Sequence, residues 1–139
     1  MTAEQVVTPA VEVTADLIAT LVDRGGYIHP LFRPSAQELA AGTSAPLPGQ
    51  AVLLLAGGLV EQSGALERAV ALLELRQVRF LRMVRAGDVL HVNLAPGEGR
   101  STRSGKILRE DAWTVLDASG ESVMEASAVM LVRVADEGS

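Results

Sequence analysis

Two short segments of this chain carry the residue types that acid–base chemistry requires. Residues 27–32 include His29, one of only two histidines in the sequence. Residues 48–50 read Pro-Gly-Gln and run directly into the apolar stretch 51–60. Histidine is the side chain best suited to move a proton at neutral pH, and the N–H groups at a helix start can hold an anion or a polarised carbonyl oxygen. Together the two segments predict acid–base chemistry on a carbonyl group.

Composition narrows the range of functions. A chain of 139 residues fits one domain, which can bury roughly two-thirds of its unfolded surface without disulfides or metals. The absence of cysteine excludes thiol catalysis and thiolate metal sites, and it fits a reducing compartment. No metal-ligand cluster is visible either, so no metal or other cofactor is expected. A net charge of −5 with one tryptophan, one tyrosine and two phenylalanines argues against a nucleic-acid partner.

The apolar stretch 51–60 is about half of the roughly 20 residues that a membrane-spanning helix needs. Residues 1–10 lack the basic start and the apolar centre of a signal peptide. We therefore expect a soluble, cytoplasmic protein that does not enter a membrane.

Helical spacing and proline content predict the secondary structure around residues 27–32 and 48–50. Thr14 precedes apolar residues at helical spacing and Gly25 follows them, which predicts a helix over about 15–23. The segment 28–48 carries four prolines and a short helical stretch at about 35–41, and we interpret it as a long functional loop. Residues 49–62 are apolar on almost every side, which predicts a helix buried on all faces.

The second half of the chain has the pattern of an antiparallel sheet. Strands are expected over about 69–84, 88–94, 106–116 and 121–134, joined by short turns that contain glycine. Residues 6–13 alternate imperfectly and are interrupted by Pro9, so they form at best a short edge strand. This order predicts an α+β fold, one domain over 1–139, in which the sheet wraps one long central helix.

These segments resemble the MaoC-like acyl dehydratases and hydratases of the hot-dog fold. The resemblance rests on residues 13–17, the loop 27–32, the glycine after Pro48, the strand and turn 78–88, and the last hairpin between 104 and 123. It implies interconversion of enoyl and 3-hydroxyacyl thioesters, carried by coenzyme A or acyl carrier protein. It also implies a homodimer or a hot-dog heterodimer.

The family signature reads roughly Gly-Asp-x-Asn-Pro-(Ile/Leu)-His, and this chain departs from it. The carboxylate position, five residues before His29, is Arg24, and the asparagine position is Gly26. The reaction needs a base for the α-proton, an acid for the departing hydroxyl and donors for the thioester oxygen. We assign the catalytic roles to His29 and Asp23. Three readings remain open: Asp23 reaches the site, His29 acts alone, or the pocket has lost hydration chemistry.

The other candidates concern binding. The thioester oxygen is assigned to the N–H groups of Gly49 and Gln50, with the side chain of Gln50 as a further donor. The acyl pocket is assigned to Tyr27, Phe32, Leu53 and Leu54.

Several residues bear on the alternative functions. Glu61 lies late on the central helix, and it would favour a thioesterase if it lined the pocket, whereas Arg24 favours a non-catalytic acyl-binding protein. His91 shares a strand face with Asn93 and is expected to face solvent. Arg76, Arg79 and Arg82 are expected to alternate between faces of a strand, with one or two meeting the phosphates of the carrier.

Overall fold

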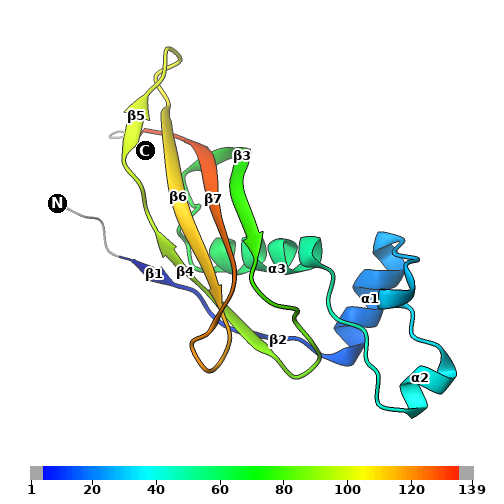
Figure 1. Ribbon diagram of the computed structural model, residues 1–139. Helices are drawn as coiled ribbons and strands as arrows, with labels where there is room; N and C mark the ends of the chain where they lie inside the picture. Colours follow the sequence, from blue (N-terminus) through cyan, green and yellow to red (C-terminus); the bar gives the residue numbers. More distant parts are fainter. Residues whose placement is uncertain (1–4, 135–139) are drawn as a thin grey trace.

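A computed structural model describes residues 5–134 and has an antiparallel sheet with one long helix packed against it. The strand order is β1-β4-β6-β7-β3, with β2 also pairing with β4 and β5 with β6. The strands are β1 (Val6–Val7), β2 (Val11–Glu12), β3 (Ala69–Phe80), β4 (Val89–Ala95), β5 (Gly99–Ser101), β6 (Ile107–Leu116) and β7 (Ser122–Val132). Figure 1 shows the helix α3 lying across one face of this sheet. The predicted α+β class and the antiparallel sheet are confirmed.

The first helix, α1 (Ala15–Gly25), begins and ends where local chemistry predicts. The Thr14 side chain accepts the N–H of Leu17 at 3.0 Å, which satisfies one free donor of the first turn. Gly26 ends the helix in the left-handed conformation, with φ of 75°, where glycine carries no steric penalty.

The central helix, α3 (Gly49–Gln62), has the predicted bounds, but it is not buried on every side by one chain. Ala51, Val52, Ala56, Leu59 and Val60 are buried. Leu54 projects from the opposite side and is 63% exposed. The expectation of full enclosure is therefore wrong for the single chain, because the sheet covers only one face of the helix.

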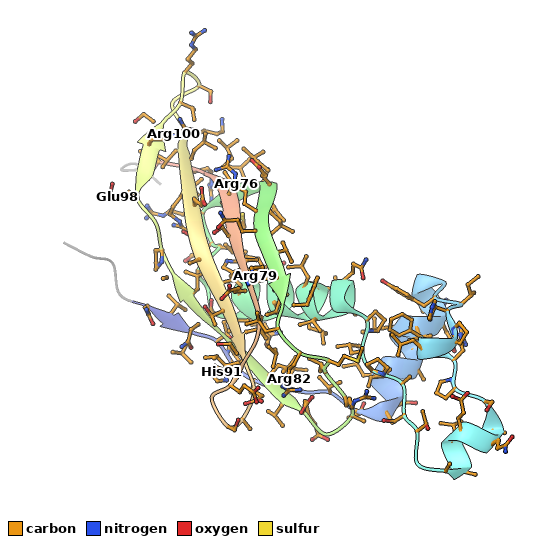
Figure 2. All side chains as sticks on the ribbon, viewed as in Figure 1. Arg76, Arg79, Arg82, His91, Glu98 and Arg100 are labelled. Carbon is orange, nitrogen blue, oxygen red and sulfur yellow. The ribbon has the colours of Figure 1, made fainter. Side chains whose placement is uncertain are left out.

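Alternation along the central strands decides which side chains meet α3. Leu90, Val92 and Leu94 of β4 are buried, and Trp113 and Val115 of β6 are buried next to them in the core. His91 lies between buried positions and is only partly covered, on the outer face of the sheet. Figure 2 shows it far along the sheet from Glu98 and Arg100.

The edge strand β3 is less regular than predicted. It ends at Phe80, and Val84 instead forms an isolated bridge with Leu47. The register shifts between Arg76 and Arg79, where Gln77 has a φ of 52°, so Arg76 pairs with Ser127 and Arg79 with Glu125. The two arginines thus share a face, and the expected alternation is wrong at this bulge. Strand β5 was not predicted at all.

The segment between α1 and α3 lies beyond the end of the sheet, next to the start of α3 (Figure 1). It contains the one-turn 3₁₀ helix Pro30–Phe32 and the short helix α2 (Ala36–Ala40). A backbone bond ties its second end to the β3–β4 connection, because Leu47 N–H donates to the Val84 carbonyl at 2.7 Å. The residue before α1 is tied to the same connection, because Val13 N–H donates to the Asp88 carbonyl at 2.7 Å. Within residues 5–134, no helix combines the length and apolarity needed to cross a membrane.

Candidate active site at the start of the central helix

The first turn of α3 has two backbone donors without a partner. Pro48 occupies the N-cap position and provides no capping side chain. Its carbonyl accepts the N–H groups of Ala51 at 2.9 Å and Val52 at 3.1 Å. The N–H groups of Gly49 and Gln50 find no acceptor within residues 5–134. Since the helix dipole also makes this end positive, the arrangement suits an oxygen that carries partial negative charge.

A cavity of about 650 Å³ opens beside these donors. Its lining is mostly apolar and comes from the 28–48 segment, the first turns of α3, the end of β3 and the connection that follows β3. The lining residues are Leu31, Phe32, Pro46, Leu47, Gly49, Gln50, Val52, Leu53, Val78, Phe80, Leu81, Arg82, Met83 and Val84. An apolar cavity with a few polar groups at one end is the usual form of a small-molecule site. We call it the Gly49 cavity.

The absence of a side chain at Gly49 has a direct structural reason. A Cβ atom built there would lie 3.1 Å from two carbons of the Phe80 ring. Glycine therefore lets the ring of Phe80 lie against the helix start, beside the free N–H groups.

His29 precedes the 3₁₀ turn, and one of its two ring nitrogens already takes part in a hydrogen bond. Its Nδ1 accepts the N–H of Leu31 at 3.0 Å, so in the neutral ring the proton is on Nε2. The side chain is exposed, and His29 does not itself line the Gly49 cavity, although Leu31 and Phe32 after it do. In this conformation His29 is a hydrogen-bond donor through Nε2.

Tyr27 connects the histidine loop to the helix start. Its hydroxyl donates to Gln50 Oε1 at 3.3 Å, and its ring meets Phe32 edge to face, with 5.2 Å between the ring centroids. This bond orients the Gln50 amide so that its NH₂ group stays available as a donor. Tyr27 thus positions neighbouring groups and does not line the cavity.

Asp23 does not line the Gly49 cavity but a neighbouring hollow that shares Phe32 with it. Its carboxylate pairs with Arg33 Nη1 at 2.6 Å, and Arg33 Nε donates to the Tyr27 carbonyl at 2.9 Å. Asp23 and Arg33 line a separate hollow, which also includes Phe32 but not Gly49. The structure therefore does not bring Asp23 into the cavity of the free N–H groups. Arg24 is exposed in the last turn of α1.

Two further sequence candidates lie away from this cavity. Leu54 faces outward, so among the four predicted acyl-pocket residues only Phe32 and Leu53 line the cavity. Glu61 is exposed near the end of α3 and lines a hollow with Trp113 and Met130. Among residues 5–134, no Asp or Glu side chain lines the Gly49 cavity.

Arg82 is a cavity residue whose role the sequence did not reveal. It donates to Asp88 Oδ2 at 3.0 Å and to Asp117 Oδ2 at 2.7 Å. Hydrogen bonds from Arg82 lower the pKa of Asp88, and those from Ser119 and Arg82 lower the pKa of Asp117 well below its usual range. These two carboxylates fix the connection after β3 that forms one wall of the cavity. The sequence did not reveal this cluster because Asp117 lies 35 residues after Arg82.

The two arginines of β3, Arg76 and Arg79, are also paired. Arg76 contacts Glu74 at 2.9 Å and Glu110 at 3.0 Å, whereas Arg79 makes one contact, to Glu125 at 3.6 Å. Figure 2 shows Arg76, Arg79 and Arg82 following one another along this edge of the sheet. Arg79 is the least engaged of the three.

No protein-family model and no curated protein matches this sequence. Solved structures match it over nearly its whole length. The monoamine oxidase regulatory protein from Archaeoglobus fulgius has a TM-score of 0.83 at 24% identity, over 98% of this chain and 92% of that one. A MaoC-like dehydratase from Rhodospirillum rubrum has a TM-score of 0.77 at 18% identity, over 98% and 94% of the two chains.

A third match, a Mycobacterium tuberculosis protein with a double hotdog fold, has a TM-score of 0.79 at 21% identity. It is aligned over 100% of this chain and 44% of its own. Two enzymes match with a TM-score of 0.69: the HadBC 3R-hydroxyacyl-ACP dehydratase complex of M. tuberculosis and an (R)-hydratase from A. caviae. The chain therefore has the hot-dog fold, with MaoC-like dehydratases and (R)-hydratases among its structural neighbours, and the predicted fold is confirmed.

Proposed function

We propose that this protein is a cytoplasmic hydratase or dehydratase that interconverts enoyl and 3-hydroxyacyl thioesters. The observation that carries the proposal is the pair of free N–H groups, at Gly49 and Gln50, at one end of an apolar cavity. Hydratases and dehydratases among the structural neighbours support the same reaction class. The substrate thioester would be carried by coenzyme A or acyl carrier protein.

The geometry supports a defined division of labour at the helix start. The thioester oxygen accepts hydrogen bonds from the N–H groups of Gly49 and Gln50, which stabilise the negative charge that develops when the α-proton leaves. The acyl chain lies along the apolar wall formed by Leu53 and its neighbours. The ring of Phe80 lies beside the oxygen site, against the first residue of α3.

Proton transfer is assigned to His29 and Asp23. In the dehydration direction, the acid is the protonated ring of His29, in which Nδ1 holds a proton in place of the bond from Leu31 N–H. This ring donates its Nε2 proton to the hydroxyl that leaves C3 as water and remains as a neutral imidazole, which regains a proton when the base releases the α-proton. Asp23 is retained as the candidate base for the α-proton, but its ion pair with Arg33 has to open before it can act.

We also propose a dimer, because β3 is an edge strand of the described sheet and carries exposed apolar residues. Val70, Leu72 and Leu73 are each about half exposed, and Leu54 of α3 is exposed as well. A second hot-dog chain, identical or related, would cover this edge. Sedimentation that detects only monomer at tens of micromolar would contradict this part of the proposal.

One competing function has a specific observation in its favour. Arg24 at the family's carboxylate position, together with the Asp23–Arg33 pair, favours an acyl-binding protein without hydration activity. A thioesterase is less well supported, since Glu61 is separated from the Gly49 cavity.

The direct test is hydration of a panel of enoyl-CoA and enoyl-ACP thioesters by the purified protein. Wild type should be active, and His29→Ala should lower the rate by about 10²-fold or more, which is the usual effect of losing a general acid–base residue. His91→Ala is the matched control, because His91 lies on the outer face of the sheet, and it should retain activity. Inactivity of wild type toward every enoyl thioester, with binding retained, would favour the acyl-binding function.

Two substitutions at the end of α1 test whether Asp23 acts as the base and whether the absence of a carboxylate at position 24 limits the rate. If Asp23 is the base, Asp23→Asn should reduce the rate as strongly as His29→Ala. If the missing carboxylate limits the chemistry, Arg24→Asp should raise the rate, because it restores an acid five residues before His29. No change in either variant would leave His29 as the sole proton-transfer group.

A further inference from the structure

A second hollow, of about 360 Å³, lies between α1 and α2. Ile18 and Val22 of α1 and Leu39 of α2 contribute apolar surface, and the Asp23–Arg33 ion pair lies at its boundary. An apolar hollow that protein atoms leave unfilled forfeits dispersion contacts. It is therefore a suitable space for an apolar part of a ligand. We call it the α1–α2 hollow.

Phe32 is the one described residue that lines both the α1–α2 hollow and the Gly49 cavity. Its side chain is only partly buried. The ring of Tyr27 packs against it edge to face, with 5.2 Å between the ring centroids. Because the Phe32 side chain lies between the two spaces, its rotation would join them.

We propose that the α1–α2 hollow accepts the distal end of a long acyl chain, and that Phe32 controls the passage to it from the Gly49 cavity. The proposal rests on the proposed function, because the thioester end must be held at Gly49 for the tail to reach Phe32. It assigns the substrate class as long-chain acyl thioesters. Short chains occupy the Gly49 cavity alone.

The lining supports an alkyl tail as the occupant. The side chains that face the hollow are mainly aliphatic, and the charged groups of Asp23 and Arg33 already neutralise each other at 2.6 Å. Each methylene removed from water improves affinity by about fourfold. Affinity for thioesters should therefore keep rising with chain length beyond the capacity of the Gly49 cavity.

The test measures binding of saturated acyl-CoA thioesters, from butyryl to palmitoyl, which cannot be hydrated. Ala19 lines the α1–α2 hollow, and the adjacent Thr20 is exposed and lines none of the cavities described above. Ala19→Leu narrows the hollow while keeping a good helix former, and Thr20→Leu adds comparable bulk outside it. Ala19→Leu should weaken palmitoyl-CoA binding by at least about tenfold, which corresponds to the loss of about two methylene contacts. Butyryl-CoA should be affected much less.

A second variant tests the passage itself. Phe32→Ala should accelerate association of palmitoyl-CoA and increase the preference for palmitoyl-CoA over butyryl-CoA, because the ring no longer separates the two spaces. Identical chain-length profiles in Ala19→Leu and Thr20→Leu would overturn the proposal. An affinity in wild type that stops rising at short chain length, or no binding of any acyl-CoA, would overturn it as well.

Hydration of crotonyl-CoA by the same preparations separates the two proposals. If the protein hydrates crotonyl-CoA but Ala19→Leu does not change its affinity for palmitoyl-CoA, the proposed function is retained. The α1–α2 hollow is then excluded as the site of the acyl tail. A protein that hydrates nothing, yet loses palmitoyl-CoA affinity in Ala19→Leu and not in Thr20→Leu, is a long-chain acyl-binding protein.

Discussion

The two ends of α3 differ in how their backbone groups are satisfied. At the C-terminal end, Ser63 accepts the N–H of Ala65 at 3.2 Å and donates to the Val60 carbonyl at 2.5 Å. Arg109 then donates to the Ala65 carbonyl at 3.3 Å and holds the fully buried Asp111 through two bonds of 2.8 Å. At the N-terminal end, Gly49 and Gln50 have free N–H groups beside an apolar cavity.

At the C-terminal end of α3 the polar groups are paired and support the fold, whereas at its N-terminal end two donors are free to bind a ligand. Buried polar groups are normally paired, because an unpaired one costs about 1–3 kcal/mol. The C-terminal end follows that rule with side chains from a neighbouring strand. At the N-terminal end the free N–H groups belong to the partly buried Gly49 and the exposed Gln50, beside the cavity, so a ligand that enters the cavity can complete their hydrogen bonds.

The largest expected effect is on stability, at the satisfied end. Asp111→Ala should lower the free energy of unfolding by about 3 kcal/mol, the lower end of the range for a buried ion pair, because it leaves the partly buried Arg109 guanidinium without its fully buried partner. Glu110→Ala is the matched control, since Glu110 is an exposed neighbour that pairs with Arg76 at 3.0 Å, and it should cost less than about 1 kcal/mol. Urea unfolding measures both. Equal losses would contradict the structural role of the Asp111 pair.

The second prediction concerns activity, at the open end. Gly49 is the first residue of α3, where proline is well tolerated, so Gly49→Pro removes one free N–H group without breaking the helix. Gly49→Ala retains the N–H group and adds the same first carbon against Phe80. We expect kcat of the proline variant to be about 10²–10³-fold below that of the alanine variant. Equal enoyl-thioester hydration by the two variants would exclude this donor from catalysis.

The difference between the two ends also explains how far the sequence could predict the fold. The bounds of α3 followed from the glycine after Pro48 and from uninterrupted apolar residues, which are local signals. The bulge at Gln77 could not be predicted, because the shift depends on how β3 pairs with β7. The exposure of Leu54 was missed for a similar reason, since no element in the described part of the chain covers that apolar face of the helix.

The site was predictable to the extent that it depends on neighbours in sequence. Gly49 and Gln50 share the first helical turn, so their joint position follows from the helix alone. The position of Asp23 depends on the path of the 28–48 segment, and Arg33 draws its carboxylate away from the cavity. The contacts of Arg82 depend on the β6–β7 turn, which supplies Asp117 from a distant part of the chain.

The third prediction concerns the wall of the Gly49 cavity, where Arg82 pairs with Asp88 and Asp117 and the polar groups are therefore satisfied, as at the C-terminal end of α3. Bonds from Ser119 and Arg82 lower the pKa of Asp117 in the folded protein. A carboxylate with a depressed pKa stabilises the fold above its ordinary pKa of about 4, and this contribution is lost as the pH falls below that value. Asp117→Asn should therefore reduce stability at neutral pH and flatten the decline between about pH 5 and pH 2. Urea midpoints measured across this range test the sign, and an unchanged slope would contradict it.

The smallest expected effect concerns the contact between the histidine loop and the open helix end. Tyr27→Phe removes the long bond of 3.3 Å to Gln50 Oε1 but preserves the ring that packs edge to face on Phe32. A single partly exposed hydrogen bond contributes about 0.5–1.5 kcal/mol, so kcat/KM for enoyl thioesters should fall by about two- to tenfold. The fall should be smaller still when Gln50 is already replaced by alanine, because the tyrosine acts by orienting the Gln50 amide. A loss above about 10²-fold that persists in the Gln50→Ala background would instead identify the Tyr27 hydroxyl as a proton donor in the reaction.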